Sequence, residues 1–238
     1  MATVLRVKHT SAACYLWLHT PEVQESKAGQ FVMVKCDGFW LERPLGIASH
    51  EGEEMLLVFA VKGKGTKWLS ARGMGDEIVV RGAFGNGFPQ VHGRALLVGG
   101  GLGLPPLLYT AQEMDCDIAC GFRNKESVIL LSEFTDACRH VALATDDGSI
   151  GLHGNAINAA EQLMQKNDYA TVFACGPHPL LRAVKVWAEE KKLPCWLSLE
   201  EHMACGIGAC LVCACASSGT YKRVCKDGPV FAADEVDV

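Results

Sequence analysis

Five of the twelve cysteines lie near the C-terminal end, and four of them have the spacing of a metal-cluster site. They follow the pattern Cys-x4-Cys-x2-Cys-x11-Cys, at Cys205, Cys210, Cys213 and Cys225. Plant-type [2Fe–2S] clusters are held by thiolates in the pattern Cys-x4-Cys-x2-Cys with a distant fourth cysteine. The small residues at 206–209 let backbone N–H groups approach the inorganic sulfides. The spacing therefore predicts a [2Fe–2S] cluster on these four thiolates.

Two other interpretations of these cysteines stay open at this point. Structural zinc sites usually pair two short Cys/His knuckles, whereas only Cys210 and Cys213 form a short pair here. The extra thiol, Cys215, would give Cys-x4-Cys-x4-Cys, which is not the known cluster spacing. The remaining cysteines are scattered through mostly apolar stretches, and we expect them to be small buried side chains: Cys14, Cys36, Cys116, Cys120, Cys138, Cys175 and Cys195.

Two segments in the first hundred residues have the residue types that bind a flavin nucleotide. The string Arg43-Pro44-Leu45-Gly46-Ile47-Ala48-Ser49 offers backbone groups along a flavin ring and an arginine for a phosphate. The string Gly63-Lys64-Gly65-Thr66 follows a predicted strand, and its glycines permit close approach to a pyrophosphate. A solvated arginine and an ordinary hairpin turn would look similar, so each segment is ambiguous alone.

A glycine-rich segment at residues 98–106 points to a dinucleotide. Gly99, Gly100, Gly101 and Gly103 end a predicted strand, and a predicted helix with prolines in its first turn follows. This order places glycines and a helix N-terminus where a dinucleotide phosphate binds. The string is not the strict G-x-G-x-x-G fingerprint, because prolines follow the glycines.

Composition excludes several classes of protein. The chain has 238 residues, 49% hydrophobic and 21% charged, which is ordinary for a globular protein. A net charge of −5 argues against general nucleic-acid binding. The sequence shows no apolar run long enough to cross a bilayer and no apolar core of a signal peptide near its start. We therefore expect a cytoplasmic protein that contacts neither membrane nor nucleic acid.

The elements that must position these motifs fall into three regions. Short strands at 4–7, 15–18, 30–35, 55–61 and 77–81, separated by turns, predict a small antiparallel barrel at 1–92. From 93 to 195, predicted strands at 94–98, 117–122, 128–131, 141–144 and 171–174 alternate with helices at 104–114, 157–165 and 179–191. That alternation predicts a Rossmann-like α/β domain with a mostly parallel sheet. Residues 196–238 are too few for a conventional core and are expected to need the cluster as a staple.

The sequence of motifs resembles the ferredoxin-reductase superfamily. The most specific likeness is to the iron–sulfur electron-transfer subunits of bacterial NAD-linked dihydroorotate dehydrogenases, and it covers nearly the whole chain. It is strongest at residues 199–210 and 225–231, which contain the cluster cysteines. Residues 85–88 look like the family's barrel-exit loop, and residues 145–149 look like one of its nicotinamide-domain loops.

This resemblance implies where the flavin and the nicotinamide bind. Arg43-Pro44-Leu45-Gly46 looks like the flavin-binding turn, Gly65-Thr66 like the phosphate contact, and Val58-Phe59-Ala60 like the strand beside the flavin. Cys175-Gly176-Pro177 looks like a loop of the nicotinamide domain. The family turn usually ends in Ser or Thr, and here Gly46 stands in that place, so a backbone amide would replace the hydroxyl.

The resemblance also implies the electron path and the partner. A separate subunit with FMN would oxidise dihydroorotate, and electrons would run from FMN through the cluster and FAD to NAD, in the biosynthesis of pyrimidines (UMP). Two copies of each subunit would form a heterotetramer. No residue of this chain is expected to act as an acid or base on substrate. Asp146, Asp147, His153 and His178 lack a nucleophile arrangement and are taken as solvated or cofactor-adjacent.

Rival functions and the choice of nicotinamide remain open on residues alone. One rival is the flavoprotein reductase subunit of a hydrogenase or of a ferredoxin:NADP oxidoreductase, and another is a zinc-stapled redox-sensing module. Arg123 and Lys125 follow the second strand of the α/β region and suit a 2′-phosphate, whereas Glu126 opposes one. NAD is chosen from the resemblance.

Overall fold

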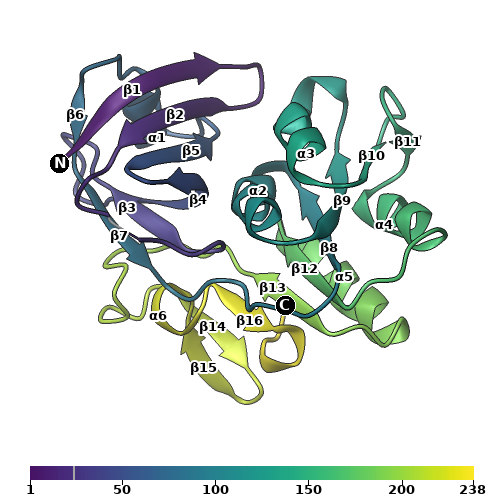
Figure 1. Ribbon diagram of the computed structural model, residues 1–238. Coiled ribbons are helices and arrows are strands. Elements are labelled where there is room, and N and C mark those ends of the chain that lie inside the picture. The colour runs from purple at the N-terminus through teal and green to yellow at the C-terminus, as the bar shows by residue number, and fades with distance from the viewer. Residues whose placement is uncertain (24) are drawn as a thin grey trace.

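The computed structural model describes residues 1–23 and 25–238, which form two large sheets and a small C-terminal segment beneath them (Figure 1). The first sheet is antiparallel and curls around its own core. The second is mostly parallel and carries helices on both faces. This arrangement confirms the predicted combination of an N-terminal antiparallel barrel-like domain with an α/β domain.

Seven strands build the first sheet, in the order β6-β1-β2-β5-β4-β3-β7. Alternating or wholly apolar runs place one face of each strand in a buried core that includes Leu16, Val32 and Leu57. One helix, α1, lies between β5 and β6. The bounds are β1 Ala2–His9, β2 Cys14–His19, β3 Phe31–Val34, β4 Arg43–Glu51, β5 Glu54–Phe59, α1 Lys64–Ser70, β6 Glu77–Ile78 and β7 Val80–Phe84.

Seven strands also build the second sheet, in the order β11-β10-β9-β8-β12-β13-β16. Helices α2 and α3 share a core with one face of this sheet, and α4 and α5 share a core with the other. The strands are β8 Ala95–Gly100, β9 Cys116–Phe122, β10 Val141–Thr145, β11 Leu152–His153, β12 Thr171–Cys175, β13 Cys195–Ser198 and β16 Val230–Ala232. The helices are α2 Leu104–Glu113, α3 Leu131–Ala137, α4 Ala156–Met164 and α5 His178–Glu190.

Most of the predicted elements are confirmed, and one is wrong. Residues 128–131 do not form a strand: Val128 follows the 3-10 turn Lys125–Ser127, and Leu131 begins α3. Ile129 and Leu130 are buried against the helical layer, so the apolar run reflects core packing and not sheet pairing. The flavin segment also differs from a turn, because Arg43 to Ser49 lie within β4.

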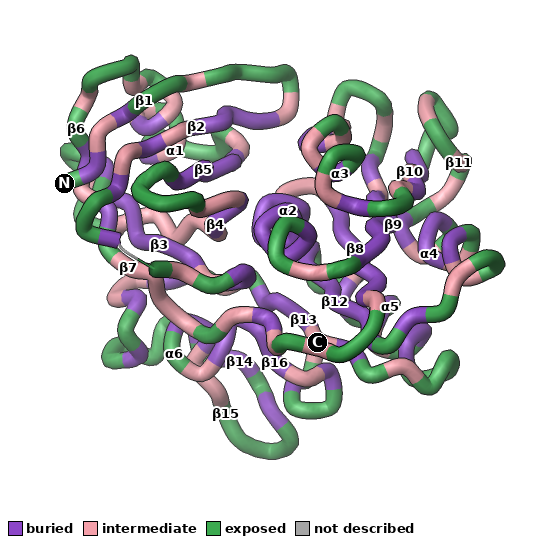
Figure 2. Tube along the Cα trace, in the orientation of Figure 1, coloured by how far each residue is buried: buried purple, intermediate pink, exposed green. Residues whose placement is uncertain are grey.

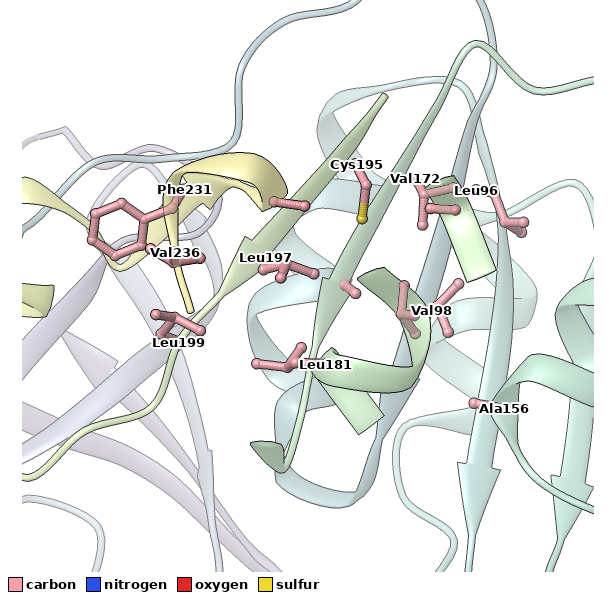
Figure 3. Packing of buried hydrophobic residues seen from close by; sticks show 14 of the residues in the cluster. Leu96, Val98, Ala156, Val172, Leu181, Cys195, Leu197, Leu199, Phe231 and Val236 are labelled. Atoms are coloured by element: carbon pink, nitrogen blue, oxygen red, sulfur yellow. The ribbon is translucent and has the colours of Figure 1, made fainter. Parts of the chain in front are cut away.

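The C-terminal segment does not have a core of its own. The hairpin β14 (Ala214–Ser217) and β15 (Thr220–Arg223) leads into α6 (Val224–Asp227), and β16 then pairs antiparallel with β13. Phe231 and Val236 pack against the same cluster as Leu197 and Leu199 (Figure 3). The segment therefore shares the hydrophobic core of the second sheet. The division at 92 and 195 remains a proposal, and β13 spans its second boundary.

Burial follows the two sheets, with exposed loops around them (Figure 2). The seven scattered cysteines are all buried, as expected. None of the helices in the described ranges 1–23 and 25–238 is long and apolar enough to span a membrane.

Candidate functional site

The four predicted cluster cysteines come together as two pairs of thiols. The Cys205 thiol interacts with that of Cys210, and the Cys225 thiol with that of Cys213. The Cys225 backbone N–H donates to Cys213 Sγ at 3.4 Å, so the second pair is held by its own backbone. The two pairs are close enough to interact electrostatically. Since each iron of a [2Fe–2S] cluster takes two protein ligands, two thiol pairs match its donor set.

Backbone N–H groups prepare the outer pair for metal. The N–H groups of Ile207, Cys210 and Ala209 lower the pKa of the Cys205 thiol to about 6. That thiol is therefore largely ionised at neutral pH, as a metal ligand must be. Burial and a hydrogen bond with Cys213 instead raise the pKa of Cys225 to about 12. Loading of the inner pair must therefore release protons.

The loop between the first two cysteines depends on glycine. Gly206 and Gly208 have φ of +73° and +80°, in the left-handed region. A Cβ on Gly206 would lie 2.8 Å from Met33 Cγ, so the loop packs closely on β3. The Gly208 N–H donates to Cys225 Sγ at 3.0 Å, which ties this loop to the inner pair.

The donor set fits a two-iron cluster better than a single ion. Across the described residues, no group of three or more His, Cys, Asp or Glu side chains is placed to hold one metal ion. A two-iron cluster needs only pairs of thiolates, and pairs are what the loop provides. Cys215 belongs to neither thiol pair: it lies in β14, where its backbone is paired with that of Lys222.

The two candidate flavin segments meet at Arg43 and Gly65. A Cβ on Gly65 would lie 2.3 Å from Arg43 Nη2, so the guanidinium rests directly on the glycine at the start of α1. Among the described residues Arg43 has no carboxylate partner, and its Nη1 donates to the carbonyls of Leu41 and Glu42. A guanidinium without an ion pair, beside a bare backbone, suits a phosphate.

Thr66 and the end of β5 complete this side of the site. Thr66 Oγ1 accepts from the N–H groups of Lys62 and Gly63 at 3.0 and 3.1 Å. Its O–H donates to the Gly63 carbonyl oxygen at 3.1 Å, so the predicted hydroxyl donor is engaged in holding the turn into α1. Val58 and Phe59 are buried at the end of β5, and Ala60 follows them half-buried. Their contact with a flavin stays a prediction.

Strand β4 joins the flavin segment to the nucleotide domain. Pro44 is paired with Met33 and Leu45 with Val32 on β3, so the segment is fixed by the sheet. A Cβ on Gly46 would lie 2.6 Å from Pro106 Cγ in the first turn of α2. The glycine that replaces the family's Ser or Thr therefore allows direct contact between the two domains.

The predicted nucleotide loops meet at the carboxyl ends of β8 and β12. These strands are parallel neighbours, with β9 on the far side of β8 and β13 on the far side of β12. A Cβ on Gly103 would lie 2.2 Å from the Cys175 carbonyl oxygen, and one on Gly176 would lie 3.4 Å from that of Gly100. Ligands of open α/β sheets bind at such a switch point, outside the carboxyl ends of the strands.

Gly101 and Pro177 flank this contact. Gly101 has φ of +55° and open space around its Cβ position. Pro177 is the residue immediately before α5. Gly103 and Gly176, where the two loops pack together, and Gly101, which has open space beside it, therefore lie along one rim at the carboxyl ends of β8 and β12.

Sequence reasoning gave no site role to Lys62, Glu200 or Glu201 at this rim, and it took His178 as solvated or cofactor-adjacent. Loss of hydration raises the pKa of the Glu200 carboxyl, and the nearby charges of Lys62 and His178 oppose that rise. His178 Nε2 also lies 3.4 Å from Glu201 Oε1. These residues come from three separate regions of the chain, and the only local signals are that Lys62 directly precedes the glycine string and His178 directly follows Cys175-Gly176-Pro177.

Arg81 was also missed, and it connects the barrel to the cluster loop. Its guanidinium forms a bidentate ion pair with Glu42, at 3.0 Å from Nε to Oε1 and 2.5 Å from Nη2 to Oε2. Nη2 also donates to the carbonyl oxygen of Cys205 at 3.4 Å. The sequence near residue 81 does not predict this contact, because Glu42 and Cys205 are both distant from Arg81 along the chain.

Comparison with known proteins identifies the C-terminal segment and the full-length chain with one family. Residues 200–237 match the iron–sulfur cluster binding domain of dihydroorotate dehydrogenase B. The electron transfer subunit of dihydroorotate dehydrogenase B (NAD(+)) from Caldanaerobacter subterraneus subsp. tengcongensis is 39% identical over 244 residues, covering 99% of this chain and 97% of the relative. The Clostridium perfringens subunit of the same name is 36% identical over 219 residues, covering 88% and 87%.

Solved structures extend the comparison. A chain of the NADH-dependent reduced ferredoxin-NADP oxidoreductase, described for flavin-based electron bifurcation, superposes with a TM-score of 0.91 at 30% identity. The match covers 100% of this chain and 90% of that chain. The ferredoxin reductase of carbazole 1,9a-dioxygenase, at 18% identity and a TM-score of 0.67 over 81% of this chain and 65% of that one, shares the fold. By its full-length relatives and its cluster domain, this chain belongs to the family of electron transfer subunits of NAD(+)-dependent dihydroorotate dehydrogenase B.

Proposed function

We propose that this chain transfers electrons between NAD and a catalytic subunit that contains FMN and oxidises dihydroorotate, in pyrimidine biosynthesis. Membership of the electron transfer subunit family supports this assignment. We further propose a heterotetramer with two copies of each subunit. A cytoplasmic location remains a prediction of the sequence.

The observation that carries the proposal is a line of direct contacts between the three candidate sites. Gly206 of the cluster loop packs on Met33, and Met33 is paired with Pro44 of the flavin segment. Two residues further on, Gly46 packs on Pro106 at the start of the nucleotide-binding helix. The flavin segment is therefore the structural neighbour of both other sites.

The residues present fit the cofactors that this role requires. Arg43 and the bare backbone at Gly65 would hold the phosphates of FAD, and β4 would support its ring. Gly100, Gly101, Gly103 and the loop Cys175-Gly176-Pro177 would receive NAD. Bound FAD supplies the exchange between a two-electron hydride and the single electrons carried by an iron–sulfur cluster. The protein's own part is to hold these groups in a fixed order and exclude water between them.

The cluster loop presents one side to a partner. Cys213 and Cys225 are buried, whereas Cys210 is exposed, so the outer thiol pair faces solvent. Ile207 and Leu211 beside it are each more than half exposed. Apolar side chains around an exposed cluster ligand favour contact with another subunit, which would exclude water from the path of the electron.

A second candidate function has one observation in its favour. The ferredoxin-NADP oxidoreductase chain superposes over the whole of this chain. A reductase subunit in such an assembly would use the same cofactors with a different partner. The two functions differ in the donor that the assembled complex accepts, so reconstitution separates them.

The test compares the isolated chain with the reconstituted pair. Alone and loaded with cofactors, the chain should reduce an artificial dye with NADH and should not oxidise dihydroorotate. With the FMN-containing subunit, dihydroorotate should reduce NAD. Ile207→Glu should abolish that reaction and leave dye reduction unchanged, because it places a charge in the contact surface.

Two results would contradict the proposal. The isolated chain could turn over dihydroorotate unaided, which would place the substrate site within it. Alternatively, the pair could fail with dihydroorotate while the chain reduces NADP from reduced ferredoxin in another complex. Flavin released on denaturation of the isolated chain should be FAD, and recovery of FMN would overturn the assignment of cofactors to subunits.

A further inference from the structure

A fully exposed tryptophan lies in the loop that precedes the flavin strand. Trp40 belongs to the connection between β3 and β4, and its side chain is entirely accessible to solvent. The next residue, Leu41, is 54% exposed. Tryptophan is usually largely buried in folded proteins, and exposed apolar pairs of this size mark contact surfaces.

This loop adjoins the cluster loop through Arg81. The same nitrogen, Nη2, bonds Glu42 in the β3–β4 loop and the carbonyl oxygen of Cys205. Arg43 Nη1 donates to the Leu41 carbonyl, which fixes the backbone beside Trp40. The position of the loop is therefore tied on one side to the cluster and on the other to the flavin strand.

The cluster loop alone is too small to bind a subunit. Its exposed apolar side chains are Ile207, Leu211 and Val212. Stable interfaces bury roughly 800 Å² on each partner and involve about 20–30 residues on each side. A partner seated over Cys210 must therefore extend onto neighbouring surface, and the neighbouring surface that Arg81 joins to Cys205 carries Trp40 and Leu41.

We propose that the β3–β4 loop, with Trp40 as its anchor, is the second half of the docking surface for the FMN-containing catalytic subunit. The proposal rests on the proposed function and names the residue that supplies much of the binding free energy. Tryptophan is enriched among the residues that dominate interfaces, because a rigid aromatic ring buries a large area at little entropic cost. The occupant is the catalytic subunit, since electron transfer requires it to cover the adjoining outer thiol pair.

Arg81 would hold the β3–β4 loop and the cluster loop in a fixed position relative to each other. Its ion pair with Glu42 is partly exposed on the arginine side and would be covered when a partner binds. Covering a charged pair at an interface costs less free energy than covering a lone charge, which would be left without a partner. The surface would then present apolar side chains on both sides of a neutralised pair.

The experiment measures the dissociation constant between this chain, loaded with cofactors, and the purified catalytic subunit. Trp40→Ala should raise that constant at least about tenfold, as truncation of an interface anchor does. Ile207→Glu serves as the variant for the cluster loop. Val186→Glu is the matched control, because Val186 is 52% exposed on α5 of the other domain. NADH-dependent dye reduction should be unchanged in all three variants, which shows that they fold and retain cofactors.

A second measurement does not depend on substitution. Hydroxyl-radical oxidation of Trp40, read by mass spectrometry, should fall when the catalytic subunit is added, whereas oxidation of the exposed Met74 reports on general shielding. Protection of Trp40 with little change at Met74 would support docking over this loop. Equal oxidation of Trp40 in the free and bound chain would overturn it.

The outcomes separate this inference from the proposed function. If Ile207→Glu weakens the complex and Trp40→Ala binds like the unmodified chain, the loop lies outside the interface and only this inference fails. If the unmodified chain does not bind the dihydroorotate-oxidising subunit at all, both fail. If the isolated chain dimerises in sedimentation and Trp40→Ala abolishes the dimer, the occupant is a second copy and the inference is overturned.

Discussion

Replacement of Gly65 by alanine would test the phosphate site without removing any of its groups. A Cβ at this position would lie 2.3 to 2.5 Å from Arg43 Nη2, Nε and Cζ. Such contacts are far inside van der Waals distance, so something must move. The arginine side chain is flexible at that end and the backbone of α1 is not. We therefore expect Gly65→Ala to leave the fold intact and displace the guanidinium.

The size of the effect follows from what the guanidinium does. A charge-assisted hydrogen bond contributes about 1.5–3 kcal/mol. Loss of that contribution would weaken FAD binding by roughly 10- to 150-fold. Arg43→Ala should have a similar effect, because it removes the same contact. The double variant should be no worse than the Arg43→Ala variant, since the effect expected of Gly65→Ala is the displacement of that guanidinium.

Flavin fluorescence titration of the apoprotein gives the dissociation constant for FAD. Gly63→Ala is the matched control, because a Cβ on Gly63 would meet nothing within 4 Å. Two findings would refute the reasoning. Gly65→Ala could bind FAD as tightly as the unmodified chain, or the two single effects could add in the double variant. The first finding would place the FAD phosphates away from Arg43, and the second would show that Gly65→Ala weakens FAD binding by a route other than Arg43.

The remaining predictions concern the cluster. Serine at Cys205, Cys210, Cys213 or Cys225 should abolish or distort the cluster, measured by iron content and electron paramagnetic resonance, because thiolate ligands are lost. Cys215→Ser should retain the iron content of the unmodified chain. Loss of iron from that variant alone would show that Cys215 is a cluster ligand and that the predicted set of four is wrong. Arg81→Gln should lower the cluster's reduction potential by about 10–40 mV, the equivalent of one partly exposed charge interaction. An unchanged potential in a titration followed by electron paramagnetic resonance would show that Arg81 only positions the loops.

Features set by local spacing could be predicted from the sequence. The four cysteines predicted to hold the cluster lie within 21 residues, from Cys205 to Cys225, so their spacing can be recognised without knowledge of the fold. The glycines at 99–103 sit between a strand and a helix, which is itself a local arrangement. Their meeting with Cys175 and Gly176 follows from the rule that parallel neighbours end at one edge of a sheet.

Features set by distant contacts could not be predicted. The apolar run at 128–131 satisfies a strand pattern, yet Ile129 and Leu130 are buried by packing near α3 and not by strand pairing. The string from Arg43 to Ser49 contains a proline and a glycine and suggested a turn, but its neighbours β3 and β5 hold it as a strand. Arg81 joins residues 42 and 205, and no window along the chain contains all three.

The C-terminal segment is fastened to both other parts of the molecule, and this limits how its variants can fail. Asn86, in the loop that leaves the barrel, forms an isolated β-bridge with Pro229. Its Nδ2 also donates to the Asp227 carbonyl oxygen at 2.9 Å. On the other side, β16 extends the second sheet through β13. The distance from the cluster to the flavin strand is thus set by packing, without need of a moving domain. A surface variant that keeps its iron and its dye reduction and loses dihydroorotate-dependent NAD reduction must therefore act on the partner side of the cluster.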